Sequence, residues 1–158
     1  MTDKNTYSKA FLGKRAEDLS NLIEQQTQPI FDELKIVVPI SSCSTILALK
    51  TLKTASLVEI ARQLEQSHQL VKQKLPKLER LGLISKSADS LDKRKTNYKL
   101  TPQGIEQSEK VESYLKVSED LVKTVSDEIG NDVAEILSDA LSALRSKTLL
   151  ERYRNYNH

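Results

Sequence analysis

Aromatic side chains are scarce in this chain of 158 residues, which has no tryptophan, two phenylalanines and five tyrosines. Its core must therefore be built from leucine, isoleucine and valine. Glycine and proline are scarce too, with four residues of each, which suits a mostly helical protein. Apolar residues make up only 38% of the chain, which is low for a self-sufficient monomer. We therefore expect part of the apolar surface to be buried against a second subunit.

Cysteine and histidine are equally rare, and this limits the chemistry that the chain can perform. Cys43 is the only cysteine, so an intramolecular disulfide is excluded and a reducing compartment fits. The two histidines, His68 and His158, belong to no cluster with ligand spacing, so we expect no zinc site. The sequence also lacks a glycine-rich phosphate loop and a recognisable Ser/His/Asp arrangement. We therefore expect neither an enzyme nor a bound cofactor.

Long apolar runs are missing as well. No run approaches the roughly 20 residues that are needed to cross a bilayer, and the first five residues contain no signal region. These features predict a cytoplasmic protein that does not enter a membrane. For Cys43 two interpretations stay open: a peroxide-sensing thiol, or a small half-buried residue near a helix start, which is the commoner case.

The charge is unevenly distributed, although the net charge is only +2. Residues 50–100 contain twelve Lys and Arg against five Asp and Glu, a net charge of +7. The rest of the chain contains twelve against seventeen, a net charge of −5. A basic middle between acidic arms places any contact with a polyanion in that middle.

Apolar residues recur at spacings of three and four along most of the chain, which is typical of amphipathic helices. The pattern predicts helices over about residues 7–34, 41–53, 57–65, 68–81, 102–129 and 132–149. We expect the polar tail, residues 152–158, to fray. No internal repeat or flexible linker interrupts the chain, so it is interpreted as one continuous structural unit.

Two of these helices are joined by a very tight turn. Ser56 and Glu59 have the spacing of a capping box, in which each residue satisfies a backbone N–H at the start of a helix. Ser67 provides a second N-cap shortly after the first helix ends, and Gly82 is a typical stop for the second helix. Such a pair is a helix-turn-helix. Pro76 removes a hydrogen bond in the second helix, so we expect a bend or an early end at residues 72–76.

A basic hairpin follows. Residues 83–88 and 97–100 alternate as strands do, and the polar loop between them forms a wing. Thr101 and Pro102 then provide an N-cap and a first helical residue for the long helix after the wing.

The helix over residues 68–81 is the candidate for reading DNA bases. Gln69 and Gln73 lie one turn apart, and a glutamine amide can donate to and accept from the major-groove edge of adenine. The other candidate DNA contacts on this helix and at its start are Ser67, His68, Lys72, Lys74 and Lys77. The alternative is an ordinary solvated helix face, but the capped turn, the basic middle and the wing together favour DNA.

The wing is the candidate for a minor-groove contact. Lys93, Arg94 and Lys95 stand together at its tip, and a narrow minor groove attracts arginine. Asp92 cannot favour phosphate, so its expected role is to hold a wing cation by a charge-assisted hydrogen bond.

At this point the chain resembles the MarR family of winged-helix transcription regulators over about residues 10–150. The most specific motif is Asp92-x-Arg94 followed by Leu100-Thr101-x-x-Gly104, supported by Ser56-Leu57-Val58-Glu59-Ile60-Ala61, Leu64, Ser67 and Leu78-Glu79-x-x-Gly82-Leu83-Ile84. The resemblance implies a homodimer, a recognition helix in the major groove, Arg94 in the minor groove and regulation by a small ligand or oxidant. Lys74 and Pro76 depart from the family pattern. Cys43 does not match the sensing position of the redox branch, which lies in the first helix.

The sequence as a whole predicts a mostly α (α+β) fold. Residues 1–38 and 102–158 are expected to form a helical dimerisation region, and residues 39–101 a winged helix-turn-helix region. The expected function is a sequence-specific, dimeric DNA-binding regulator, most simply a repressor, with double-stranded DNA of near-palindromic sequence as its partner. The alternative is a winged-helix module that binds a protein instead of DNA.

Overall fold

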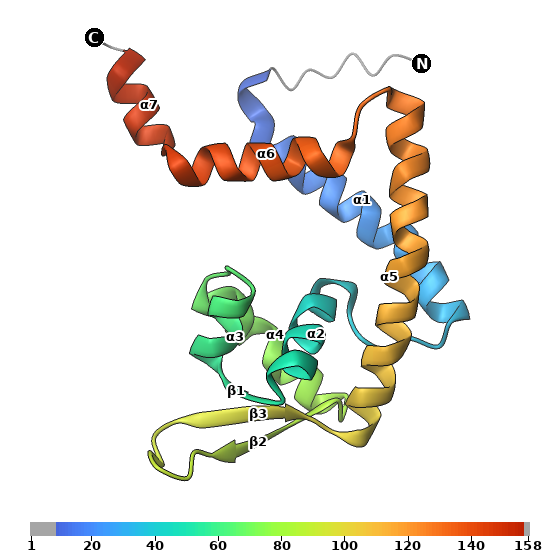
Figure 1. Ribbon diagram of the computed structural model, residues 1–158, viewed down its shortest axis with the longest axis vertical. Helices are drawn as coiled ribbons and strands as arrows, with labels where there is room; N and C mark the ends of the chain where they lie inside the picture. Colours follow the sequence, from blue (N-terminus) through green and yellow to red (C-terminus); the bar gives the residue numbers. More distant parts are fainter. Residues whose placement is uncertain (1–8, 157–158) are drawn as a thin grey trace. The chain divides into compact units, whose positions relative to one another are not determined.

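The computed structural model describes residues 9–156, and Figure 1 shows the order of their elements. Its helices are α1 (Leu12–Glu33), α2 (Cys43–Leu52), α3 (Leu57–Gln63), α4 (His68–Arg80), α5 (Pro102–Ile129), α6 (Val133–Ser146) and α7 (Leu149–Tyr156). Short 3-10 turns, Lys9–Phe11 and Ile40–Ser42, precede α1 and α2. The strands are β1 (Thr54–Ser56), β2 (Ile84–Ala88) and β3 (Thr96–Leu100). Tyr7, where the sequence predicts the first helix to begin, lies outside the described residues.

The chain forms two compact units, Met1–Glu112 and Ser113–His158. The division into a dimerisation region and a DNA-binding region stays a prediction. In the first unit the strands form an antiparallel sheet of order β1-β3-β2, and the β2–β3 hairpin extends away from α2, α3 and α4 (Figure 1). Tyr98 in the central strand pairs with Ala55 on one side and Lys86 on the other. The sequence predicted β2 and β3 but missed β1, which is too short to show an alternating pattern.

The core of the first unit is aliphatic, as the composition predicts. Phe31 is the only aromatic side chain among the buried residues that the structure describes. Ile46 and Leu49 of α2, Ile60 of α3, and Val71 and Leu78 of α4 are completely buried. Burying a side chain of this kind contributes about 1.5–3 kcal/mol, so the apolar stripes hold the three helices together.

Caps position the helices of the helix-turn-helix where the sequence predicts them. The backbone N–H of Glu59 donates to the Ser56 hydroxyl at 3.4 Å, and the Ser56 N–H donates to the Glu59 carboxylate at 2.8 Å, which completes the capping box. At α4 the N–H of Leu70 donates to the Ser67 hydroxyl at 3.3 Å. Of the two outcomes expected at residues 72–76, the early end is wrong, because α4 continues to Arg80, and the bend stays a prediction. A buried face formed by Val71, Leu75 and Leu78 holds the helix across the missing hydrogen bond.

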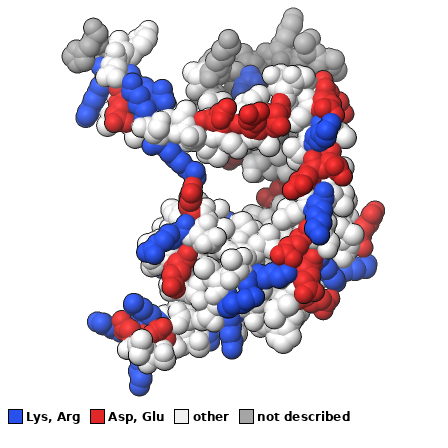
Figure 2. Space-filling view, in the orientation of Figure 1, with Lys and Arg blue, Asp and Glu red and all other residues white. Residues whose placement is uncertain are grey.

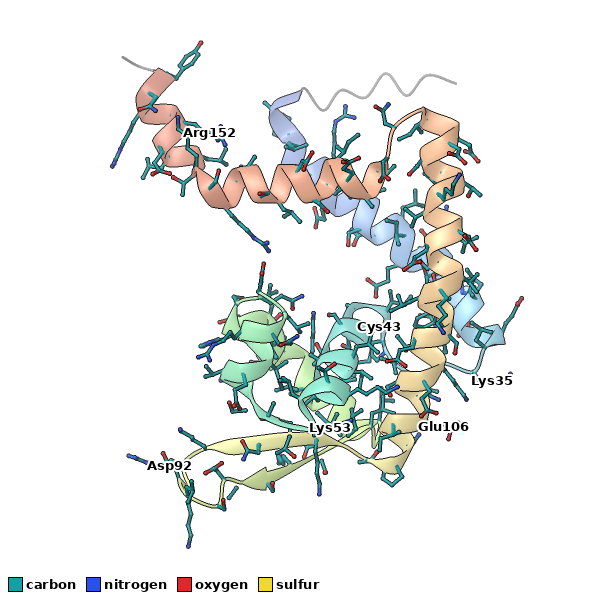
Figure 3. The ribbon with its side chains drawn as sticks, viewed as in Figure 1. Lys35, Cys43, Lys53, Asp92, Glu106 and Arg152 are labelled. Atoms are coloured by element: carbon teal, nitrogen blue, oxygen red, sulfur yellow. The ribbon has the colours of Figure 1, made fainter. Side chains whose placement is uncertain are left out.

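In the second unit the end of the chain differs from the prediction. Asp132 caps α6 as expected, with the Glu135 N–H at 2.9 Å from its carboxylate. The expected single last helix ends at Ser146, and α7 begins with a second capping box between Thr148 and Glu151. The tail was expected to fray, but Arg152 is helical, and its guanidinium donates to the carbonyls of Ala143 and Lys147 at the end of α6 (Figure 3).

Candidate nucleic-acid interface

The outward face of α4 consists of polar and basic side chains. Val71, Leu75 and Leu78 point into the core, so the helical period turns the opposite side of α4 to solvent. His68, Gln69, Lys72, Gln73 and Lys77 are all exposed there, as predicted. The amides of Gln69 and Gln73, one turn apart, are therefore free to approach base edges. Ser67 is exposed as well, but its hydroxyl is already engaged at the helix start.

Lys74 lies apart from this set. Its ammonium donates to the side-chain carbonyl of Gln66 at 3.1 Å, and the side chain is half-buried. Burial lowers the pKa of the Lys74 ammonium. Because α4 turns by 100° per residue, Lys74 lies beside the buried stripe and not on the face of Gln69 and Gln73. In this geometry a phosphate contact by Lys74 requires its bond to Gln66 to break.

The wing presents cations around a loop that contains two carboxylates. Figure 2 shows Lys and Arg side chains around the wing tip with acidic side chains between them. Lys93, Arg94 and Lys95 are exposed, and the Arg94 side chain is 92% accessible. Asp92, which lies at the tip of the wing in Figure 3, accepts the Arg94 side-chain Nε–H at 3.2 Å and its backbone N–H at 3.1 Å. The structure thus contains the arginine-holding contact that the sequence suggested for Asp92.

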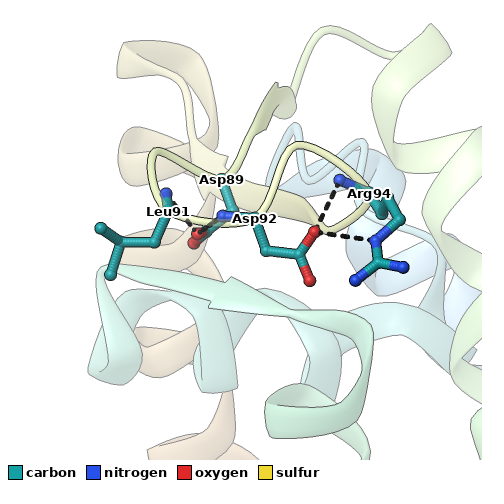
Figure 4. A network of polar contacts seen from close by, with 4 residues as sticks. All are labelled: Asp89, Leu91, Asp92 and Arg94. Atoms are coloured by element: carbon teal, nitrogen blue, oxygen red, sulfur yellow. Dashed lines mark hydrogen bonds and ion pairs between the residues drawn. The ribbon is translucent and has the colours of Figure 1, made fainter.

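Asp89 organises the same loop, and the sequence analysis did not single it out. One of its carboxylate oxygens accepts the backbone N–H groups of Leu91 at 2.9 Å and Asp92 at 3.0 Å, as Figure 4 shows. The other accepts the Asn97 side-chain amide at 2.8 Å. These bonds, above all the one from the Asp92 N–H, lower the pKa of the Asp89 carboxyl. An Asp that accepts backbone N–H groups two and three residues later is an Asx turn, which could have been predicted from local sequence.

A shallow groove between α4 and the sheet adds Lys86 and Tyr98, which sequence reasoning missed. Lys72, Pro76, Lys86 and Tyr98 are among its lining residues. Lys86 lies on β2 and pairs with Glu79 of α4 at 3.0 Å, which ties the wing to α4. Only the folded chain brings these positions together, because Lys86 and Tyr98 come from different strands.

Cys43 has the properties of a structural residue. It is half-buried at the start of α2, and its thiol lies 3.7 Å from the carbonyl oxygen of Pro39 (Figure 3). Burial raises the pKa of the Cys43 thiol to about 11. A reactive, oxidant-sensing thiol needs a lowered pKa, so this geometry favours the structural interpretation.

Residues 9–156 contain neither a cluster suited to a metal ion nor a helix suited to a membrane. No group of three or more His, Cys, Asp or Glu side chains in this range could hold a metal ion. In the same part of the chain, no helix combines the length and the apolar character that a membrane span requires.

Comparison with known proteins shows which solved structures share this architecture. No protein-family model and no curated protein sequence matches the chain. Solved structures do match. The S. aureus MepR–DNA complex is 25% identical, with a TM-score of 0.60, covering 90% of this chain and 99% of MepR. BpsR of Bordetella bronchiseptica is 23% identical with a TM-score of 0.62, covering 90% and 96%. Reduced MarR of E. coli is 19% identical with a TM-score of 0.58, covering 89% and 98%.

The helices, the three-stranded sheet and the basic hairpin define the class: this is a winged helix-turn-helix protein. Its fold is that of the MarR family, and the resemblance indicated by the motifs around Asp92 and Gly104 is confirmed.

Proposed function

We propose that this protein is a dimeric, sequence-specific DNA-binding transcription regulator that acts as a repressor. The observation that supports this most strongly is the wing, where Asp92 holds an otherwise exposed Arg94 beside Lys93 and Lys95. The capped helix α4, with its exposed amides, lies in the same compact unit. The match to MepR, which was solved bound to DNA, supports the same function.

Each part of the surface has a distinct role in this proposal. Gln69 and Gln73 read adenine edges in the major groove, where a bidentate contact discriminates by about 1–3 kcal/mol. His68, Lys72, Lys77 and the N-terminal backbone of α4 at Ser67 contact phosphates or base edges. Arg94, with Lys93 and Lys95 beside it, enters the minor groove. Lys74 contributes only once it is released from Gln66.

The exposed apolar faces support the homodimer. None of the described residues of Ser113–His158 is buried, and apolar side chains such as Val125, Ile129, Ile136 and Leu141 are about half exposed. On α1, Leu12, Leu22 and Ile23 are similarly exposed. Surfaces of this kind mark subunit contacts. A symmetric dimer that uses them would read a near-palindrome with half-sites roughly 34 Å apart.

A small-molecule effector completes the proposal. BpsR, which shares this fold, has its DNA binding regulated by 6-hydroxynicotinic acid. The raised pKa of Cys43, the only cysteine, favours a non-covalent ligand over an oxidant as the releasing signal. Stabilisation of the full chain against heat by individual compounds, together with loss of DNA binding, would identify such a ligand.

The experiment that tests the function is selection of bound duplexes from a random pool, followed by titration of the recovered site. We expect a two-fold symmetric site and affinity that falls steeply with salt. Arg94→Ala should weaken binding to all duplexes. It should also reduce the slope of log affinity against log salt concentration by about one. Gln73→Ala should instead relax base preference at one position per half-site. Lys116→Ala, an exposed cation of α5, is the matched charge control.

Two outcomes contradict parts of this proposal. If Arg94→Ala binds the recovered site with unchanged affinity, the assignment of the wing is wrong. If the unmodified protein binds no duplex even at low salt, the winged fold serves to bind a protein partner instead. The net charge of −5 outside residues 50–100 is the feature that favours this alternative.

A further inference from the structure

Leu91, at the wing tip, is the most exposed large apolar side chain of the described residues, at 96%. A single exposed leucine is common on protein surfaces and indicates nothing alone. The position of Leu91 is unusual because it lies in the same loop as Lys93, Arg94 and Lys95, on the element proposed to contact DNA. This inference rests on that proposed function.

The loop holds Leu91 in a defined place before any partner binds. Its backbone N–H donates to Asp89 at 2.9 Å, beside the bond from Asp92 to the same oxygen. Two backbone bonds close the loop, from the Asp89 N–H to the Lys95 carbonyl at 2.9 Å and from the Lys95 N–H to the Asp92 carbonyl at 2.8 Å. Figure 4 shows the Leu91 side chain directed away from the Asp92–Arg94 pair. An ordered apolar group loses little backbone freedom on binding, which favours affinity.

The charges around Leu91 indicate the chemistry of its partner. Both carboxylates of the loop already have hydrogen-bond donors, since Asp89 is bonded to backbone and Asn97, and Asp92 to Arg94. The cations at the tip that are not paired with these two carboxylates are Lys93 and Lys95, and the guanidinium of Arg94 stays exposed although it is paired with Asp92. A polyanion with accessible apolar surface between its charges fits this arrangement, and the minor groove offers sugar rings and stacked base edges between two rows of phosphates.

We infer that Leu91 is an apolar wedge, presented to the minor groove together with Arg94, that makes binding depend on the deformability of the base step it contacts. A leucine can form no hydrogen bond with a base, so it cannot read donors and acceptors. It can press between base pairs, and such wedges unstack and kink the duplex. Pyrimidine–purine steps such as TA and CA yield easily, whereas A-tracts are stiff. Leu91 therefore adds specificity at a position where the protein forms no polar base contact.

The test uses the full-length protein and the duplex recovered by selection. Hydroxyl-radical footprinting, with Arg94→Ala as reference, locates the minor-groove contact of the wing. Two versions of the duplex then carry either a TA step or an AA step at that contact. Affinity for both is measured over a range of salt for the unmodified protein, Leu91→Ser and the conservative Leu91→Met. Val58→Ser, at an exposed apolar residue of α3 outside the wing and outside the proposed dimerisation region, is the matched control.

We expect Leu91→Ser to lose about tenfold in affinity for the TA duplex and much less for the AA duplex. A tenfold loss is what removing the burial of one apolar side chain should cause. The salt slope should stay unchanged because no charge is removed. Leu91→Met should restore the preference, and Val58→Ser should bind like the unmodified protein. Leu91→Ser and Leu91→Met should unfold at the same temperature as the unmodified protein, because the Leu91 side chain is 96% exposed and contributes no burial.

The outcomes separate this inference from the function on which it rests. If the unmodified protein binds no duplex, the proposed function fails first. If it binds, and Leu91→Ser shows the same affinity or an equal loss on both duplexes, then Leu91 is not a wedge and the regulator assignment stands.

Discussion

The buried side chain of Gln107 on α5 accepts a hydrogen bond from the backbone N–H of Val37 at 2.8 Å. Its amide also donates to the carbonyl of Lys35 at 3.2 Å, so one side chain pairs with the backbone on both sides of Ile36. Ile36 and Val38 are buried on the same segment, and Lys35 adopts a positive φ of 56°. Gln107 thus fixes the connection between α1 and α2 against the start of α5.

Replacing Gln107 with leucine should destabilise the protein. The side chain keeps a similar volume, but the Val37 N–H loses its partner, and the Lys35 carbonyl keeps only the Lys110 ammonium at 3.4 Å. Leaving such groups unpaired costs about 1–3 kcal/mol each when they are buried, and less where water can reach them. We expect a loss of about 2 kcal/mol in chemical denaturation. Gln103→Leu, on the exposed side of the same helix, is the control; an equal effect there would refute the role of Gln107.

Gly104 should tolerate no side chain. A Cβ at this position would lie 1.9 Å from the carbonyl oxygen of Leu83 and 2.9 Å from its carbonyl carbon, and backbone cannot move aside as a flexible side chain can. Gly104→Ala should therefore cost about 3 kcal/mol or more. Gly13→Ala is a matched control, since nothing lies within 4 Å of a Cβ there. It should leave stability unchanged or raise it by up to about 1 kcal/mol. Thermal unfolding distinguishes the two variants, and similar melting temperatures would contradict the close packing of α5 on Leu83.

Acid should weaken the capping box of α3. Hydrogen bonds from the backbone and hydroxyl of Ser56 lower the pKa of the Glu59 carboxyl below its usual 4.5. A carboxylate with a lowered folded-state pKa stabilises the fold above its unfolded-state pKa, and this contribution is lost as the pH falls through the folded-state value. The stability difference between the unmodified protein and Glu59→Gln should therefore be larger at pH 7 than at pH 3. Urea denaturation at both pH values tests this, with Glu24→Gln on α1 as a control that caps no helix. A pH-independent difference would contradict the prediction.

Cys43 should be an unreactive thiol in the folded protein. With its pKa raised to about 11, only roughly one thiol in a thousand or fewer is ionised at neutral pH. Alkylation by iodoacetamide at pH 7.5 should be at least about tenfold slower in the native state than in urea, and its rate should rise with pH up to about 11. DNA binding should survive peroxide. Rapid native alkylation with loss of DNA binding would restore the sensing hypothesis.

Local chemistry explains why much of the fold was predictable. Ser56, Ser67, Thr101 and Asp132 cap the helices predicted from sequence, because each cap depends on residues only two or three positions away. Thr148 and Glu151 form a second capping box, which is the same kind of local signal. It was not used in the prediction, so one last helix was expected where the structure has two. Pro76 does not end α4, because the packing of Leu75 and Leu78 outweighs one missing hydrogen bond.

The candidate site also has a part that was predictable from sequence and a part that was not. Helical periodicity alone placed Gln69, Lys72 and Gln73 on an exposed face, and the hairpin signal placed Arg94 at a wing tip. Periodicity could not show that Lys74 turns toward Gln66, because that bond crosses from one helix to the preceding turn. Nor could it pair Lys86 with Glu79 or show that β1 completes the sheet.

The sequence by itself determined the aliphatic core, the order of capped helices and the concentration of positive charge in residues 50–100, since these follow from composition and from contacts within a few residues. Only the tertiary structure decided which polar groups are already paired and which remain free. Gln107, Asp89 and Gly104 owe their roles to partners brought close by folding, and such pairing depends on where the backbone places groups in space.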